Sequence, residues 1–294
     1  MLTGPAIAGF AILMFSASAH GQFTTAGTWQ NFTIISAEGL TNTGFTVVEG
    51  NIALFPNASF VGFPPGLVVN GSVYSAPNPI SQEIARIART DAFSAYSDLQ
   101  NAISTSNLTG IDLGTLPALT PGVYTFDSSA QLTGTLELNA NVANSIFIFQ
   151  VNSALTTASN ANVIISGANA GCARIYWQIG SSATIGTDTN FLGTIIANES
   201  VTLTTGATLL NGRAIGLTAA VTLDTNNVAS LAPGPFCPPD TSALPMVTAS
   251  MLTAEELTAI FQMGFSGAAA QNLSIQRHLE SVRRGGGSPP TSPH

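Results

Sequence analysis

Short alternations of apolar and polar residues recur along the chain and predict stacked β-strands. In four segments an aliphatic residue is followed two positions later by threonine, and the aliphatic anchors Leu155, Ile185, Leu203 and Leu223 are 30, 18 and 20 residues apart. Self-similarity at such periods is typical of repeat architectures. Because side chains alternate between the two faces of a strand, segment 201–204 sends its aliphatic residues inward and its threonines outward.

Repeats of unequal length that are rich in strand-forming residues and glycine predict an irregular β-solenoid. Adjacent coils of such a fold lie about 4.8 Å apart, so equivalent side chains form columns on its surface. We expect one outer column to run through Thr157, Thr187, Thr205 and Thr225, with Thr, Ser, Ala and Asn on one flat face. This face is the main candidate for function.

The register between the first two repeats has two solutions. Gln150 and Gln178, which end two apolar runs, are 28 residues apart, whereas Leu155 and Ile185 are 30 residues apart. Both offsets are even, so we expect the same side chains to face outward in either register.

A change in the spacing of apolar residues predicts one long helix over about residues 80–103. Apolar residues recur there at steps of mostly three and four, with polar and charged residues between them. The apolar positions are Ile80, Ile84, Ile87, Phe93, Tyr96 and Leu99. We expect this helix to pack one apolar face along the large body of the protein.

The two ends of the chain differ in composition from the repeats. Residues 1–19 contain an apolar run that ends in Ala-Ser-Ala, as a secretory signal peptide does. The solenoid is expected over 20–232 and a Pro-rich linker over 233–252. In the tail, 253–294, Thr253 and Glu256 have the spacing of a capping box and predict a helix, followed by a disordered end.

Charge is scarce along the whole chain of 294 residues. There are 15 acidic residues and 7 basic ones, and none of the basic residues is lysine. Nucleic acid and anionic membranes are therefore poor partners, since both require clustered Lys or Arg. No segment after the signal peptide has the roughly 18 uninterrupted apolar residues of a membrane span, so no membrane insertion of the mature chain is expected. With its signal peptide the chain is expected to be secreted, or associated with the cell surface, and to be a monomer.

Two cysteines, Cys172 and Cys237, are compatible with one disulfide in an oxidising compartment. Two unpaired thiols fit the sequence equally well, because spacing alone does not show whether their Cα atoms approach each other. Their spacing is not that of metal ligands, and the chain suggests neither a metal nor a cofactor.

Several strings between about residues 26 and 230 resemble the microbial ice-binding, or antifreeze, protein family that has a discontinuous β-helix fold. They occur in the family's order at 62–66 (GFPPG), 108–113 (LTGIDL), 119–124 (LTPGVY), 129–136 (SAQLTGTL), 146–150 (IFIFQ), 177–184 (WQIGSSAT) and 203–214 (LTTGATLLNGRA). The resemblance implies a mainly β fold, namely an irregular right-handed parallel β-helix of triangular section with one long α-helix alongside.

The resemblance also implies that the protein binds ice crystals through outward short side chains, often in a Thr, Ala-or-Gly, any, Thr-or-Asn pattern. Segments 157–160 and 205–208 match that pattern, whereas Asp188 replaces the small residue in a third copy. The expected activities are thermal hysteresis and inhibition of ice recrystallisation. The candidate ice-binding residues are Thr157, Ser159, Asn160, Thr187, Thr189, Asn190, Thr205, Ala207, Thr208, Thr225 and Asn227.

Three other interpretations compete with ice binding. Outward threonines are good strand formers on any solvated face, so they need not have a function of their own. A polysaccharide lyase or hydrolase would require paired carboxylates or a basic residue in a cleft, but Arg174 and Arg213 are the only arginines of the predicted coils, and Arg213 is expected to bind carbonyls at a turn. No catalytic constellation is found, so we expect no enzyme. A cell-surface adhesin anchored through the C-terminal region is the third alternative.

Overall fold

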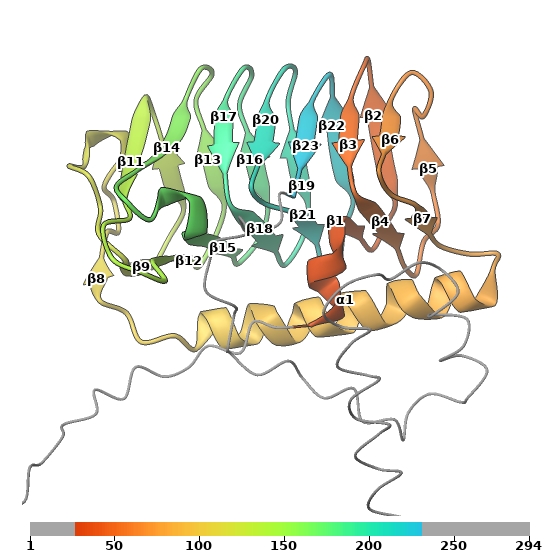
Figure 1. Cartoon of the computed structure of the whole chain (residues 1–294), viewed down its shortest axis with the longest axis horizontal. Helices are drawn as coiled ribbons and strands as arrows, with labels where there is room; N and C mark the ends of the chain where they lie inside the picture. Colours follow the sequence, from red (N-terminus) through yellow and green to blue (C-terminus); the bar gives the residue numbers. More distant parts are fainter. Residues whose placement is uncertain (1–26, 231–294) are drawn as a thin grey trace, which may run out of the picture.

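The computed structural model describes residues 27–230, and every element named below lies in that range. The predicted signal peptide, linker and tail, as well as Cys237, lie outside the described residues. Within this range the chain forms three parallel β-sheets that make the three sides of a solenoid, with one helix alongside (Figure 1). The predicted mainly β solenoid with a single long helix is confirmed.

Sheet A has nine strands and supports the helix. Its order is β7 (Val73–Tyr74), β4 (Asn51–Leu54), β1 (Phe32–Ser36), β21 (Ala214–Gly216), β18 (Thr194–Ala197), β15 (Arg174–Ile179), β12 (Ile146–Val151), β9 (Gly122–Phe126) and β8 (Ser106–Asn107). Three short 3-10 helices interrupt the coils: η1 (Thr28–Asn31), η2 (Leu113–Thr115) and η3 (Ala170–Cys172).

Sheets B and C have seven strands each and form the other two sides. Sheet B runs in the order β10 (Ala130–Leu132), β13 (Leu155–Thr157), β16 (Ala183–Ile185), β19 (Val201–Leu203), β22 (Val221–Asp224), β2 (Leu40–Thr43) and β5 (Phe60–Val61). Sheet C runs β11 (Thr135–Asn139), β14 (Asn162–Ser166), β17 (Asn190–Leu192), β20 (Thr208–Leu210), β23 (Asn227–Ala229), β3 (Val47–Glu49) and β6 (Leu67–Val69).

The order of the coils in the stack differs from their order in the chain. The chain first builds the coils of β1 to β7, then runs along α1 (Pro79–Gln100) to the far end and builds coils back towards its start (Figure 1). The last coil closes the stack, because β21, β22 and β23 pair with β1, β2 and β3. Coils far apart in sequence thereby form continuous sheets.

The register between β12 and β15 resolves the ambiguity left by the sequence. Gln150 pairs with Gln178, and on the next side of the solenoid Thr156 pairs with Thr184. The offset is therefore 28 residues, and Leu155 lies opposite Ala183.

Aromatic side chains stack inside the solenoid along its axis. The rings of Tyr124 and Phe149 are 5.5 Å apart, those of Phe149 and Trp177 are 4.0 Å apart, and Phe191 follows 4.9 Å beyond Trp177. Large buried aromatic rings contribute strongly to core energetics. This column, together with aliphatic residues from all three sheets, makes the solenoid a single packed core.

The helix packs on sheet A through small residues. Its fully buried positions are Ala85, Ala88, Ala92, Ala95 and Leu99. The predicted helix is confirmed, and one apolar face of it packs along the solenoid as expected, but alanines make most of the fully buried contact. Ile80 is 41% exposed, and the other large residues flank the alanine stripe. Alanine allows close approach of the helix backbone to the outward residues of sheet A.

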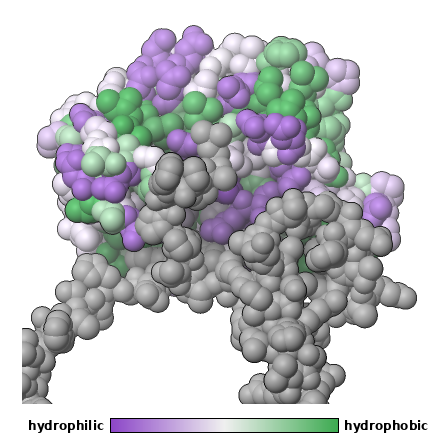
Figure 2. Space-filling model, viewed as in Figure 1, coloured by the Kyte–Doolittle hydropathy of each residue, from purple (hydrophilic) through white to green (hydrophobic). Residues whose placement is uncertain are grey.

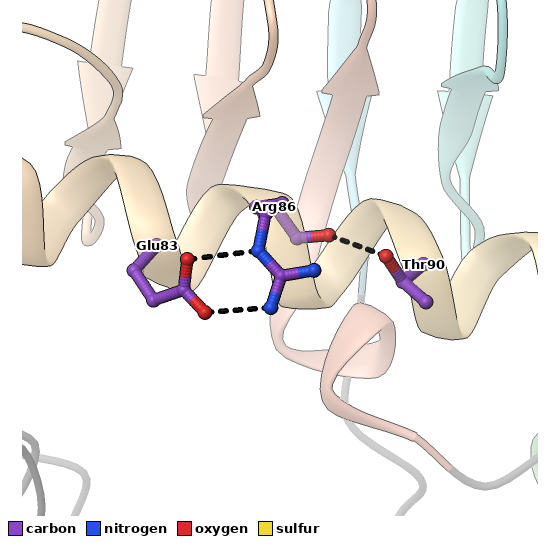
Figure 3. A network of polar contacts seen from close by, with 3 residues as sticks. All are labelled: Glu83, Arg86 and Thr90. Atoms are coloured by element: carbon purple, nitrogen blue, oxygen red, sulfur yellow. Dashed lines mark hydrogen bonds and ion pairs between the residues drawn. The ribbon is translucent and has the colours of Figure 1, made fainter. Parts of the chain in front are cut away.

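Hydrogen bonds fix both ends of α1. The Asn78 side chain accepts a hydrogen bond from the Ser81 N–H (3.0 Å) at the N-terminus. At the C-terminus, Gln150 Nε2 of β12 donates to the carbonyl oxygens of Leu99 (2.7 Å) and Ala102 (2.8 Å). The exposed side of the helix carries a two-bond contact between Arg86 and Glu83 (Figure 3). Within residues 27–230, no helix has the length and hydropathy of a membrane span.

Candidate functional site

Only two of the three sheets expose an outer face. The outward residues of sheet A, including Ile148, Tyr176 and Ile196, are buried beneath the helix. Sheets B and C are not covered by any other described element. Figure 2 shows apolar and polar residues interspersed over the side in view, without one continuous apolar area.

Sheet B carries a single column of threonines in register. Thr156 pairs with Thr184, Thr184 with Thr202, Thr202 with Thr222, and Thr222 with Thr41. All but the half-buried Thr202 are exposed. At a strand spacing of about 4.8 Å the five residues cover about 19 Å along the solenoid. Gln131 and Val61 continue the column at its two ends.

The hydroxyl groups of this column are available to water. None of the hydroxyls of Thr156, Thr184, Thr202, Thr222 and Thr41 has a hydrogen-bond partner among the residues that the structure describes. β-branching leaves few choices for χ1, so each threonine presents its hydroxyl and methyl groups in a restricted arrangement. The column is therefore a regular array of threonine side chains whose hydroxyls have no hydrogen-bond partner among residues 27–230.

Three tight turns join sheet B to sheet C and form what we call the B–C corner, 158–161, 186–189 and 204–207. In each turn the N–H of the fourth residue donates to the carbonyl of the first, at 3.3, 3.2 and 3.1 Å respectively. The third residue has positive φ in every case: Asn160, Asp188 and Gly206. Asn, Asp and Gly tolerate that backbone conformation. The second residues, Ser159, Thr187 and Thr205, thus line the edge of sheet B.

Several predicted contact residues lie inside the protein instead of on its surface. Thr157, Thr189 and Ala207 are 3%, 0% and 0% exposed, so the expectation that they face outward is wrong. Thr157 lies two residues after the inward Leu155, and side chains two apart on a strand share one face. Thr189 and Ala207 are the last residues of corner turns, where the chain has already turned inward.

The other predicted residues divide between two surfaces. Ser159, Asn160, Thr187, Thr205 and Thr225 lie at the corner between sheets B and C. Asn190, Thr208 and Asn227, by contrast, pair in register on the outer face of sheet C.

Sequence reasoning missed the sheet B column. The signal was present, because strict alternation from Leu155 makes Thr156, not Thr157, the outward residue. Thr202 was correctly expected to face outward.

Sheet C offers a different chemistry. Its polar column is paired internally: Asn190 Nδ2 donates to Asn162 Oδ1 (2.9 Å), and Thr208 Oγ1 donates to Asn190 Oδ1 (3.2 Å). A second column on the same face contains Ile164 and, in later coils, Leu192 and Leu210. Ile164 is 44% exposed. Polar groups that bond to each other have fewer lone pairs and protons left for ordered water.

Two carboxylates lie near the corner. Asp224 accepts hydrogen bonds from the hydroxyls of Thr205 (2.5 Å) and Thr225 (3.0 Å), so these two threonines direct their protons at a protein group. Asp188 is exposed, and its carboxylate extends over Gly206 of the next coil.

The polar groups elsewhere have structural contacts. Arg213 Nη2 and Nε donate to the carbonyl of Gln30 at 2.6 and 3.2 Å, and the guanidinium lies over the Trp29 ring. Burial lowers the pKa of Arg213 from its usual value. The expectation that Arg213 binds a carbonyl is confirmed. Within residues 27–230, no group of three or more His, Cys, Asp or Glu residues has the arrangement of a metal site.

Two backbone N–H groups, one in its own turn and one in the following coil, hold the Asp112 carboxylate. Its carboxylate accepts hydrogen bonds from the N–H groups of Gly114 and Thr133, both at 2.9 Å. Burial raises the pKa of Asp112, but the hydrogen bonds from Thr133 and Gly114 outweigh it and hold the pKa below its usual value. Cys172, in η3, is disulfide-bonded.

The chain is similar to known ice-binding proteins in sequence and in fold. The chain is 44% identical over 205 residues to an ice-binding protein of Nostoc sp. (strain HG1), covering 69% of this chain and 73% of that protein. A crystal structure of an ice binding protein from an Antarctic biological consortium superposes with a TM-score of 0.62 at 38% identity, covering 69% of this chain and 89% of that one.

A second solved structure extends the likeness to a eukaryotic source. The ice-binding protein of the Antarctic ascomycete Antarctomyces psychrotrophicus matches with a TM-score of 0.63 at 32% identity, over 70% of this chain and 97% of its own. The profile of the family described as ice-binding-like matches residues 34–229. Since that match spans most of the chain, the protein belongs to the ice-binding protein family.

Proposed function

We propose that the protein adsorbs to ice through the threonine column of sheet B. The observation that carries this proposal is the set of in-register hydroxyls, Thr156, Thr184, Thr202, Thr222 and Thr41, without protein partners among the described residues. Each hydroxyl can hold a water molecule, and each methyl group restricts the positions of its neighbours. The strand spacing repeats this arrangement at equal intervals along the face.

Rigidity supports adsorption to a crystal. Every strand of sheet B is joined to the next by parallel backbone hydrogen bonds, and the side chains behind the face belong to the packed core. A preorganised surface loses little conformational entropy on binding. Individual contacts to water are weak, so the effect depends on the number of residues that fit at once.

The expected activities are thermal hysteresis, which is a gap between melting and freezing temperatures, and inhibition of ice recrystallisation. We infer that the protein is secreted, because residues 1–19 have the pattern of a signal peptide. We also infer that it acts as a monomer, because one chain carries the whole threonine column. Sequencing the N-terminus of the protein recovered from culture medium tests secretion, and size-exclusion chromatography with light scattering tests the oligomeric state.

A pair of matched substitutions tests the choice of face. Thr184→Tyr on sheet B should abolish most thermal hysteresis and crystal faceting, because a large ring breaks the flat array. Thr208→Tyr is the control on sheet C, where Thr208 pairs with Asn190 and Asn227 across the strands. The assay is nanolitre osmometry of the full chain, with circular dichroism to confirm folding. Loss of activity only in Thr208→Tyr would assign ice binding to sheet C, and a wild-type protein without hysteresis would contradict the proposal itself.

A further inference from the structure

The B–C corner contains a buried pair of hydroxyls that the surface array does not include. Thr157, at the end of β13, and Thr189, in the next coil, lie with their Oγ1 atoms 3.1 Å apart inside the solenoid. Both side chains are buried. A buried hydroxyl is costly unless it is hydrogen-bonded, so its partners show what it does.

The hydrogen bonds of this pair have a defined direction. Thr189 Oγ1 donates to the carbonyl of Ala158 (3.0 Å), which leaves the Thr157 hydroxyl as the donor to Thr189. The Thr157 oxygen in turn accepts from the N–H of Gly186 (2.8 Å). The pair therefore joins the first residue of one corner turn, Ala158, to the first residue of the next, Gly186.

A side chain in a later coil makes the same kind of connection. Asn226 directly precedes β23, as Thr189 directly precedes β17, and is 3% exposed. Its Nδ2 donates to the carbonyls of Thr204 (2.8 Å) and Ala207 (2.9 Å), the first and last residues of the preceding turn. Its Oδ1 accepts from the N–H of Asp224 (2.6 Å). Twice along the corner, a buried polar side chain thus reaches back to the turn of the neighbouring coil.

These turns begin directly after the strands that carry the surface threonines. Thr156 and Thr184 are each two residues before the first residue of a turn, Ala158 or Gly186. Without the Thr189 hydroxyl, the Ala158 carbonyl would keep only the 3.3 Å hydrogen bond from the Ala161 N–H, and without the Thr157 hydroxyl the Gly186 N–H would lose its acceptor. The turn would then have to shift or admit water to replace the lost bond, because an unmade hydrogen bond in the protein interior is costly. Such a shift would tilt the last residues of β13 and β16 out of line with the rest of the column.

We propose that Thr189, acting with Thr157, is a positioning residue that keeps the coils of β13 and β16 level at the edge of the ice-binding face. The inference rests on the proposed function of sheet B. It replaces the sequence-based expectation that these two threonines contact ice themselves. The pair touches no ice and acts only through Ala158 and Gly186.

The test compares two buried threonines that differ in location. Thr189→Val removes the hydroxyl with almost no change of shape, and Thr33→Val is its control. Thr33 is fully buried in β1, and its hydroxyl donates to the carbonyl of Glu49 (2.6 Å), away from sheet B. Each substitution removes two hydrogen bonds, those of Thr189 with Thr157 and Ala158 or those of Thr33 with Glu49 and Ser230. Each should therefore lower Tm by a similar amount, about 4–8 °C for a domain of this size.

Ice activity separates the two substitutions. At temperatures near freezing, where both full-length variants are folded by circular dichroism, Thr189→Val should lose most of its thermal hysteresis and change the facets of the crystals, whereas Thr33→Val should match the wild type. Thr189→Ser keeps the hydroxyl and should restore most of the hysteresis. Equal hysteresis in Thr189→Val and Thr33→Val would overturn the proposal.

A second substitution keeps the test decisive if Thr189→Val does not fold. Thr157→Val removes the acceptor of the Gly186 N–H and should give the same loss of hysteresis, and full activity in a folded Thr157→Val protein would overturn the inference. A wild-type protein that shows hysteresis, lost in Thr184→Tyr, establishes the proposed function independently of these results.

Discussion

Replacing Thr225 with asparagine should stabilise the protein. Thr225 has a φ of 56°, in the left-handed region, where a β-branched residue is a conformational outlier. The equivalent corner positions in other coils are Asn160, Asp188, Gly206 and Gly44, which also have positive φ. These residue types adopt the conformation at lower cost. Thr225 is thus the one β-branched residue at a position where the neighbouring coils have Asn, Asp or Gly.

The expected gain follows from two opposing terms. The left-handed conformation costs an L-residue about 1–2 kcal/mol, and asparagine relieves part of this cost. The substitution removes the hydrogen bond from Thr225 Oγ1 to Asp224 Oδ1, which is 3.0 Å long and exposed, so its loss costs about 0.5 kcal/mol. The free energy of unfolding should therefore increase by about 0.5–1 kcal/mol, which raises Tm by about 1–4 °C.

Urea titration and thermal melting of the full chain measure this change. Thr222→Asn serves as the control, because Thr222 has a strand conformation in β22, where asparagine is disfavoured. The control should lose stability. A Thr225→Asn protein less stable than the wild type would refute the argument from backbone strain. Thermal hysteresis should persist in Thr225→Asn, since Thr225 lies outside the threonine column.

Two further predictions concern the packing of α1 and the hydrogen bonds of Asp112. Ala92→Leu should lower the free energy of unfolding by about 1–3 kcal/mol, because Ala92 is fully buried between α1 and sheet A and a larger side chain overpacks the contact. Ser94→Leu, on the exposed side of α1, is the control and should have little effect. Urea titration measures both. The lowered pKa of Asp112 means that its contribution to stability is fully present above its unfolded value, about 3.9, and disappears as the pH falls through the folded value. The difference in unfolding free energy between the wild type and Asp112→Asn should accordingly shrink between about pH 5 and pH 2, and a constant difference would contradict this account.

The solenoid and its helix could be predicted because their signals are local. Apolar residues at every second position predict strands, and apolar residues at steps of three and four predict a helix; both patterns can be recognised within a short stretch of sequence. The packing of the helix could not be predicted in the same way. The pattern emphasised large residues such as Ile80, whereas the contact uses the alanines of α1, because the distance between helix and sheet is set by the sheet.

The order of the coils in the stack could not be predicted from the sequence either. Nothing local shows that the chain runs the length of α1 before building its remaining coils, or that β22 pairs with β2. Thr41 therefore had no visible relation to Thr222, although the two lie side by side in the threonine column. Thr41 and Thr222 are 181 positions apart in the chain (222 − 41).

The predicted outer column does not form one flat surface in the structure, and the corner turns explain why. Counting from an anchor such as Leu203, Thr205 should share the inward face, yet it is exposed because it is the second residue of a turn and no longer part of β19. Residues with similar sequence context thus point in different directions on either side of the turn. A motif read as one flat surface is divided between an edge and sheet C.

Sheets B and C differ in whether the polar side chains on their outer faces form hydrogen bonds with each other. On sheet C, Asn162, Asn190 and Thr208 satisfy one another along the column, next to aliphatic residues such as Ile164. On sheet B, threonines such as Thr184 have hydroxyls without protein partners among the described residues. Water that is organised by a surface must bond to it, and side chains that bond to each other compete with that water. The proposed assignment of ice binding to sheet B follows from this difference, not from the number of threonines on either face.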